Sequence, residues 1–179
     1  MADQLHLVDQ PAEMEAIATS VDNNGGVYIV PAFAGLGAPW WNSQVKGAVF
    51  GLTFAATKAH VVRAALESIA YQVKDLADVM AQATGGALTE ICADGGPTRN
   101  AFLMQFQADM LQTPIVCTEV EDASALGAVV MNGFARQLWN SFDEVASLRK
   151  MTRMVLPHHT TEHNRLYAEW RKAVGQLCK

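Results

Sequence analysis

The sequence predicts an α/β fold with a parallel β-α-β core. Two short apolar segments, residues 88–93 and 114–117, are each followed by a stretch of helical character. Neither segment alternates between polar and apolar residues, which is typical of parallel strands buried on both faces. Short connections between the strands and helices favour the same arrangement. We expect a single domain, because 179 residues suffice for one compact core and are few for two.

The first third of the chain predicts a helix and two strands. Residues 11–21 have amphipathic spacing with Pro11 in the first turn, and the polar, glycine-rich run 22–26 ends the helix. Residues 27–30 and 48–53 are rich in β-branched and aromatic side chains and could pair as strands.

A rigid loop connects these two strands. It contains Gly35, Gly37 and Pro39 around Trp40 and Trp41, a composition too aromatic for a flexible linker. We expect the tryptophans to wedge the loop against the core, which is a commoner use of such residues than stacking on a sugar.

The longest helix is predicted to begin at Thr57 or Lys58 and to end at Gly85-Gly86. Its apolar residues recur at alternating spacings of four and three, the pattern of a buried face. They are Val62, Leu66, Ile69, Val73, Leu76 and Met80. Arg63 and Glu67 lie four residues apart on this helix, so we expect an ion pair there and not a general base.

A tight turn, Asp94-Gly95-Gly96-Pro97, follows the first core strand and leads into a helix near residues 100–111. Ligands of open α/β sheets bind outside the carboxyl ends of the strands. Two glycines let the backbone approach a ligand closely, and the start of the next helix offers free N–H groups. A tight turn without a ligand explains these residues at least as well.

The remainder of the chain predicts two further helices. Residues 123–135 are rich in small side chains, and Ser124-Ala125-Leu126-Gly127-Ala128 within them indicates close packing against another element. The last helix is expected over 161–177, with Glu162 in its first turn, where a helix dipole favours an acidic residue.

The composition excludes several classes of function. The formal net charge is −5 without a Lys/Arg block, so neither a nucleic-acid partner nor an anionic membrane is expected. No signal peptide and no apolar run of about 20 residues is visible. Three scattered cysteines, Cys92, Cys117 and Cys178, suit neither a disulfide framework nor a zinc cluster. We therefore expect a cytoplasmic protein that acts on small molecules.

No metal site is predicted. Three histidines lie near the carboxyl end of the chain, at His158, His159 and His163. They lack nearby cysteines and a helical i, i+4 pair with a supporting carboxylate, so we expect them in an exposed polar loop.

Four blocks of the sequence, in this order, are similar to those of the glycerol kinases within the FGGY family of carbohydrate kinases. They are residues 31–41, 51–72, 94–109 and 125–128. In the second block, Gly51-Leu52 is followed after seven residues by a run from His60 to Glu67 that resembles the second FGGY signature. The resemblance spans residues 27–138 and extends more weakly to both ends.

The resemblance implies an ATP-dependent kinase with an actin-like, ribonuclease-H-like ATPase domain that phosphorylates glycerol. It assigns Gly96 and Asn100 to the adenine and ribose side of the ATP site, and Gly95 belongs to the same turn. Residues 125–127 are expected to support that pocket from behind. Magnesium is expected to bind through the ATP, without assigned protein ligands.

The same resemblance implies that parts of the kinase are missing from this chain. The family's catalytic base, its polyol-binding residues and its phosphate-binding hairpins belong upstream of the segments matched here. We therefore expect residues 1–179 to form a carboxy-terminal domain that lacks its first strands, with no catalytic residue and no activity alone. Glycerol or a related polyol would be bound by the missing part. Without the first strands, the strand at 88–93 should have an open edge and an apolar face of the helix 58–80 should be uncovered, which predicts a homo-oligomer.

Alternative functions remain open at this point. The chain could be a non-catalytic nucleotide-binding or protein-interaction domain derived from a sugar kinase. Residues 42–47 replace a segment that contains Asp-Pro in the family, which leaves a kinase for another sugar or polyol as a further alternative. An unrelated dinucleotide-binding domain is disfavoured, because the Gly-x-Gly-x-x-Gly turn is absent.

Overall fold

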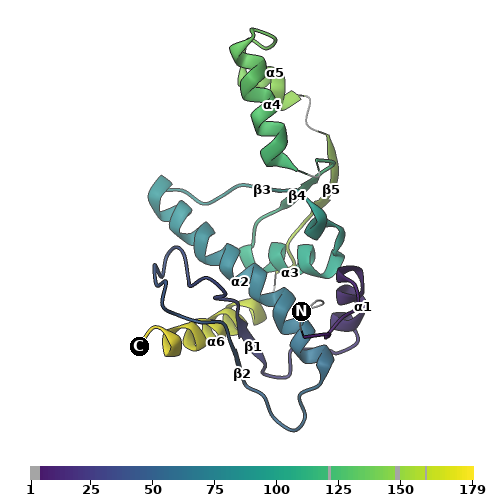
Figure 1. Cartoon of the computed structure of the whole chain (residues 1–179), viewed down its shortest axis with the longest axis vertical. Helices are drawn as coiled ribbons and strands as arrows, with labels where there is room; N and C mark the ends of the chain where they lie inside the picture. The colour runs from purple at the N-terminus through teal and green to yellow at the C-terminus, as the bar shows by residue number, and fades with distance from the viewer. Residues whose placement is uncertain (1–4, 121, 148–149, 160) are drawn as a thin grey trace.

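Two small sheets and one long helix organise the part of the chain that the structure describes (Figure 1). This computed structural model describes residues 5–120, 122–147, 150–159 and 161–179. β1 (Tyr28–Val30) pairs antiparallel with β2 (Ala48–Phe50). The second sheet has the order β3 (Ile91–Ala93), β4 (Ile115–Thr118), β5 (Met151–Val155), with β3 parallel and β5 antiparallel to β4.

Helices connect and cover these strands. In chain order they are the 3-10 helix η1 (Pro11–Glu13), α1 (Met14–Thr19), α2 (Lys58–Thr84), the 3-10 helix η2 (Gly96–Arg99), α3 (Ala101–Leu111), α4 (Ala123–Ala135), α5 (Phe142–Ser147) and α6 (Glu162–Leu177). The segment of η2 and α3 joins β3 to β4, so the predicted parallel β-α-β unit is confirmed. In the described ranges, none of the helices has the length and apolar character needed to cross a bilayer.

Two elements were not predicted from the sequence, namely α5 and β5. α5 is only six residues long, too short for a clear helical period. β5 carries Arg153 between two methionines and lacks a β-branched run, and its strand conformation depends on pairing with β4.

The long helix α2 buries a different face from the one that apolar spacing predicts. Val62 and Leu66 of the predicted face are buried, but Ile69, Leu76 and Met80 are exposed. The face that is buried along most of the helix carries polar residues among small ones. It consists of Ala64, Glu67, Ser68, Ala70, Tyr71, Asp75 and Ala77. The stripe is therefore a core face only in the first half of α2. In the second half Leu76 and Met80 are exposed, which agrees with the expectation that an apolar face of this helix is uncovered.

An aromatic cluster joins α2 to the carboxyl-terminal helix α6. The ring of Trp170, fully buried on α6, stacks on Tyr71 of α2 with centroids 5.5 Å apart. Phe106 of α3 meets Tyr71 edge to face at 5.7 Å. The Trp170 indole N–H also donates to the Ile29 carbonyl of β1 at 2.9 Å. One side chain of α6 thereby ties together the long helix and the first sheet.

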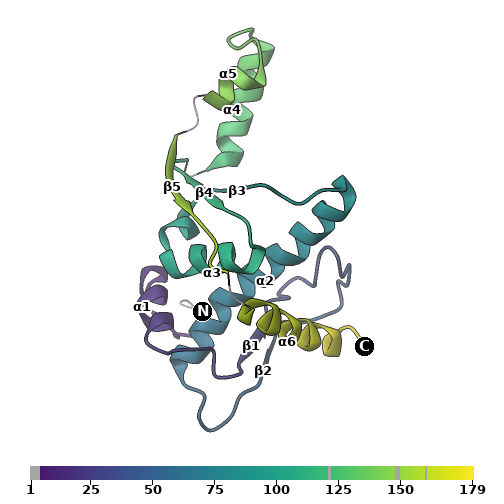
Figure 2. The same cartoon turned by 180° about the vertical axis from the view of Figure 1, so that it is seen from behind.

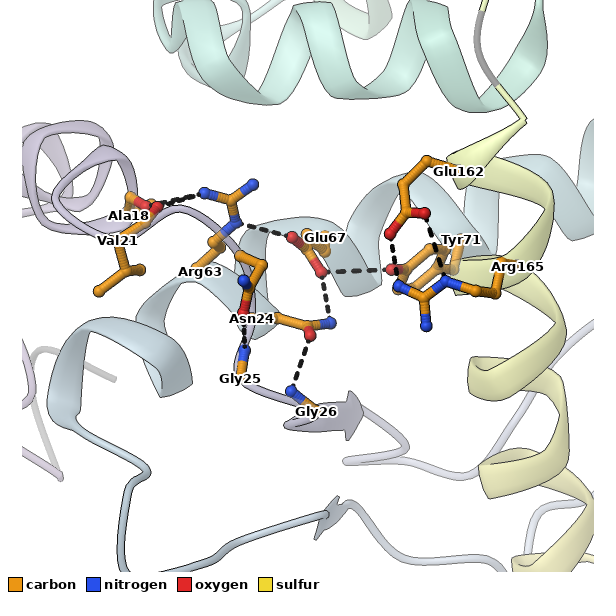
Figure 3. A network of polar contacts seen from close by, with 11 residues as sticks. Ala18, Val21, Asn24, Gly25, Gly26, Arg63, Glu67, Tyr71, Glu162 and Arg165 are labelled. Carbon is orange, nitrogen blue, oxygen red and sulfur yellow. Dashed lines mark hydrogen bonds and ion pairs between the residues drawn. The ribbon is translucent and has the colours of Figure 1, made fainter.

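A buried carboxylate on α2 organises the segment before β1 (Figure 3). Glu67 is 1% exposed and accepts hydrogen bonds from Arg63 Nε at 2.9 Å and Asn24 Nδ2 at 2.9 Å. The Tyr71 hydroxyl donates to the same carboxylate at 3.2 Å. Arg63 in turn donates to the Val21 carbonyl at 2.6 Å. The predicted Arg63–Glu67 ion pair is confirmed, and it is part of a larger buried network.

A second buried carboxylate fixes the loop between β1 and β2. Asp75 of α2 accepts a hydrogen bond from the Trp40 indole at 2.7 Å and another from the Tyr167 hydroxyl. Trp40 thus wedges the loop against the core, as predicted. Trp41 does not, because its side chain is 79% exposed.

The two parallel strands differ in their burial. β4 is buried along most of its length, as predicted, between α3 on one side and the neighbouring strands. β3 is not, because Cys92 is exposed and only β4 pairs with β3 in the described structure. The expectation that both strands are buried on two faces was wrong for β3, which forms an open edge of the sheet.

α4 and α5 project away from the remainder of the chain in both views (Figures 1 and 2). Within α4, all of which the structure describes, Gly133 is the only buried residue, and a Cβ there would lie 1.8 Å from the Trp139 ring. The segment 124–128, which was expected to pack closely, is exposed. Close packing in α4 therefore occurs in its last turn and not at the predicted segment.

We expect the stability of the protein to depend on pH through Glu67. Burial raises the pKa of Glu67 above its ordinary value of 4.5, although hydrogen bonds from Arg63, Asn24 and Tyr71 act in the opposite direction. The folded state then binds more protons than the unfolded state above pH 4.5, so stability from this group is complete below 4.5 and is lost as the pH rises through the folded-state pKa. Replacing Glu67 by Gln removes this contribution.

Urea denaturation of the wild type and Glu67→Gln at several pH values tests this expectation. The unfolding free energy of the wild type minus that of the variant should fall as the pH rises above 4.5, with a slope of at most about 1.4 kcal/mol per pH unit. A difference that grows with pH would mean that the ion pair with Arg63 outweighs the cost of burial.

Candidate functional site

The turn after β3 has a backbone conformation that requires glycine. Gly95 has φ 81° and ψ −177°, a region of backbone space that essentially only glycine occupies. Its N–H donates to the Val120 carbonyl at 3.2 Å, which joins the turn to the segment after β4. The chain then reverses into η2. The first glycine of the predicted site is therefore needed for the shape of the turn.

Gly96 has a different role, because its backbone is not strained. A Cβ at Gly96 would meet no atom within 4 Å, and the residue is exposed. The absence of a side chain leaves open space in front of the turn. Gly96 is therefore a position where a ligand can approach the backbone closely.

Asn100 forms the N-cap of α3. Its side-chain oxygen accepts a hydrogen bond from the Leu103 N–H at 2.8 Å. This bond satisfies one of the free donors in the first helical turn. Since the oxygen is engaged, the amide NH₂ group is the part of Asn100 that can donate to a ligand.

Three side-chain hydrogen bonds attach this turn to other segments. Arg153 of β5 donates to the Thr98 carbonyl at 2.9 Å. Glu15 of α1 accepts a hydrogen bond from the Ala101 N–H at 2.8 Å. Asp94 accepts one from the Ala123 N–H at 3.0 Å and thereby caps α4. The turn between β3 and α3 is thus attached to β5, α1 and α4.

Cavities lie on both sides of the turn. Gly96 and Asn100 line one of about 500 Å³, whose other walls are mainly apolar. These walls come from α1, α2 and α3 and include Met14, Leu66, Ile69 and Leu103. Gly95 lines a separate cavity of about 330 Å³ on the β4 and β5 side. The structure therefore brings Gly96 and Asn100 to one cavity and Gly95 to the other.

The charges near the turn are of both signs. Arg99 and Glu15 line the larger cavity, and Arg99, Arg153 and Glu119 line the smaller one. A flat apolar group fits the mainly apolar walls of the larger cavity.

In the described residues, no group of three or more His, Cys, Asp or Glu side chains could hold a metal ion. The three histidines near the carboxyl end do not all lie in an exposed loop. His163 is on α6 with a side chain only 13% exposed, 3.7 Å from the Asp109 carboxylate, whereas the side chain of His158 is 68% exposed. The expectation of an exposed loop was thus wrong for His163, because the start of α6 packs on α3.

Sequence reasoning found the turn but missed the side chains that hold it. Gly95, Gly96 and Asn100 are close in sequence, so a local motif was sufficient to group them. Glu15 and Arg153 lie 86 and 55 residues from their partners in the turn. Each occupies an ordinary position of an amphipathic helix or a mixed strand, and no local pattern distinguishes it.

Comparisons with known proteins agree with this architecture. Residues 2–136 match the C-terminal domain of the FGGY family of carbohydrate kinases. The chain is 46% identical over 173 residues to a glycerol kinase from Clostridium beijerinckii and 45% identical over 175 residues to one from Thermus thermophilus. These alignments cover 96% and 97% of this chain but only 35% of each relative. The chain thus spans about a third of the length of the curated relatives it matches.

Solved structures show the same relationship. A structure of Plasmodium falciparum glycerol kinase with ADP superimposes with a TM-score of 0.85 at 34% identity, covering 98% of this chain and 35% of that one. A gluconate kinase from Lactobacillus acidophilus superimposes with a TM-score of 0.84 at 22% identity, over 99% of this chain and 37% of that one, a likeness of fold alone. The expected fold of the family is confirmed. The chain therefore belongs to the FGGY family of carbohydrate kinases, and residues 2–136 correspond to the C-terminal domain of that family.

Proposed function

We propose that this chain is the nucleotide-binding portion of a carbohydrate kinase that phosphorylates glycerol. In that reaction the γ-phosphoryl group of ATP passes to a glycerol hydroxyl, which loses its proton, and ADP leaves. One observation carries the proposal: in a chain of the FGGY family, the turn after β3 presents an unobstructed glycine and a cap residue to a largely apolar cavity. The glycerol kinase relatives support glycerol as the acceptor.

The adenosine part of the nucleotide fits the cavity lined by Gly96 and Asn100. Its volume of about 500 Å³ lies within the usual range for small-molecule sites. A flat base can lie against the Gly96 backbone because no side chain obstructs it. The Asn100 NH₂ group can donate to a ring nitrogen of the base, while the oxygen keeps capping α3.

The remaining parts of the reaction need residues from elsewhere in the kinase. Phosphoryl transfer depends on positioning the reactants and on stabilising charge at the phosphates. We infer that Mg²⁺ binds through the phosphates of ATP, and that the catalytic base and the polyol site belong to the other part of the protein. Residues 1–179 would then form a C-terminal domain without its first strands. The free thiols of Cys92, Cys117 and Cys178 suit a reducing cytoplasm.

The open edge of β3 indicates where other strands would add. Apolar side chains are also exposed along the second half of α2 and along α4. They are Leu76, Val79 and Met80 on α2 and Leu126, Val129 and Met131 on α4. Exposed strand edges and apolar patches are readily covered by another polypeptide. We infer that the rest of a kinase covers this surface, and that a second copy does so when the chain is alone.

We expect the purified chain to show no glycerol-dependent release of ADP from ATP. A coupled ADP assay with glycerol present and absent measures it. A full-length relative from the same family serves as the positive control. Turnover that follows the chain through every purification step would contradict the assignment of the catalytic base to another part of the protein.

Replacing Gly96 by Trp should abolish ADP binding without unfolding the chain. The new side chain has free space and an unstrained backbone, but it fills the cavity that the base needs. Gly86→Trp is a matched control, because a Cβ at Gly86 would also meet no atom within 4 Å and the residue lies beyond the end of α2. Calorimetry with ADP measures the affinity, and circular dichroism checks the fold. Equal binding by wild type and Gly96→Trp would place the base elsewhere.

The isolated chain should self-associate at micromolar concentration through the open edge of β3 and the exposed apolar residues of α2. Leu76→Lys, which places a charge in the exposed apolar patch of α2, should shift the distribution towards monomer. Leu52→Lys is the control, because Leu52 is similarly exposed but precedes the opposite end of α2. Analytical ultracentrifugation measures the result. A wild-type chain that is monomeric and unfolds cooperatively would contradict this expectation.

A further inference from the structure

A carboxylate of α1 contacts the start of α3 across a long stretch of sequence. Glu15 is half-buried, and its Oε2 accepts a hydrogen bond from the Ala101 N–H at 2.8 Å. Ala101 is the first residue of α3, and the first N–H groups of a helix have no partner within the helix. The contact therefore satisfies a donor that the local chain leaves open.

Two side chains share the capping of α3. Asn100 accepts from the Leu103 N–H, and Glu15 accepts from the Ala101 N–H. The negative charge of Glu15 is also favourable at this position, because the amino end of a helix carries partial positive charge. The start of α3 is thereby fixed both by its own cap and by a residue of α1.

Glu15 also belongs to the wall of the cavity that contains Gly96 and Asn100. Pro11, Ala12 and Met14 form the same wall, immediately before Glu15 in the chain. The hydrogen bond to Ala101 therefore sets the separation between the wall formed by α1 and the turn opposite it. If this bond is lost, the two walls can move relative to each other and the width of the cavity can change.

We propose that Glu15 is a positioning residue of the nucleotide site, which holds α1 against the start of α3 so that the adenosine fits between them. This proposal rests on the proposed function, because it concerns the same cavity. Glu15 acts through the backbone of Ala101 and needs no contact with the nucleotide. Its carboxylate is required as a hydrogen-bond acceptor of the correct length.

Glu13 provides a matched comparison in the same segment. Its carboxylate is exposed, accepts a hydrogen bond from the Asp9 N–H at 3.3 Å, and is not among the residues that line the cavity. A change of charge at Glu13 therefore alters the same region of the surface without altering the contact to α3.

The experiment measures ADP affinity by calorimetry for the wild type, Glu15→Ala, Glu15→Asp, Glu15→Gln and Glu13→Ala. Glu15→Ala should weaken ADP binding about tenfold, because a hydrogen bond to a charged group is lost. Glu15→Asp should show a similar loss, since its side chain is one methylene shorter and cannot reach the Ala101 N–H. Glu15→Gln should restore affinity to within about twofold, because its amide oxygen accepts the same bond.

Hydrogen exchange of the Ala101 amide, measured without nucleotide, reports whether Glu15 protects the start of α3. Exchange should be faster in Glu15→Ala and Glu15→Asp than in the wild type, Glu15→Gln or Glu13→Ala. Unchanged ADP affinity in folded Glu15→Ala and Glu15→Asp would overturn the role of Glu15 and leave the proposed function standing. A wild-type chain with no measurable ADP binding would overturn the nucleotide site itself, and the positioning role with it, whatever the exchange data show.

Discussion

The fold depends on two carboxylates that α2 buries, because each of them needs hydrogen-bond donors. Glu67 and Asp75 are 1% and 3% exposed and lie on the same side of the helix. An uncompensated charge in the protein interior is very costly, so donors have to surround each carboxylate. α2 supplies Arg63 and Tyr71 itself, and the other donors described above come from distant segments. The arrangement of those segments follows from this requirement.

Each carboxylate attaches a different part of the chain to α2. Glu67 binds Asn24, which lies just before β1, and Asp75 binds Trp40 in the loop after β1. Asp75 also accepts from Tyr167 of α6, and the neighbouring Trp170 donates to the backbone of β1. The first sheet and α6 are therefore both anchored through the buried carboxylates of α2. Among the described residues, the second sheet has no comparable anchor on α2 and is held through the packing of α3 on β4 and β5.

The proposed site belongs to the second sheet, which these carboxylates do not anchor. The turn at 94–100 lies at the edge of the second sheet, where β3 lacks a second neighbouring strand in the described structure. Its shape is set by backbone contacts and by side chains from α1, β5 and the turn itself, so it keeps a defined form beside the open edge of β3. Apolar residues of α2 and α4 are exposed as well. The proposed site is thus a formed turn beside an open strand edge.

The sequence by itself determined the elements whose signals are local. Capping and turn residues located the ends of α2 and α3, the paired glycines and Asn100 identified the turn after β3, and ordered motifs indicated the family. The tertiary structure decided which face of α2 is buried, because an apolar period cannot reveal that Glu67 and Asp75 are supplied with donors from segments 35 or more residues away. It also decided the pairing of β5 and the contact of Glu15 with α3, since both depend on residues brought together only by folding. Local chemistry specifies elements, whereas hydrogen-bond partners across the chain specify how those elements are assembled.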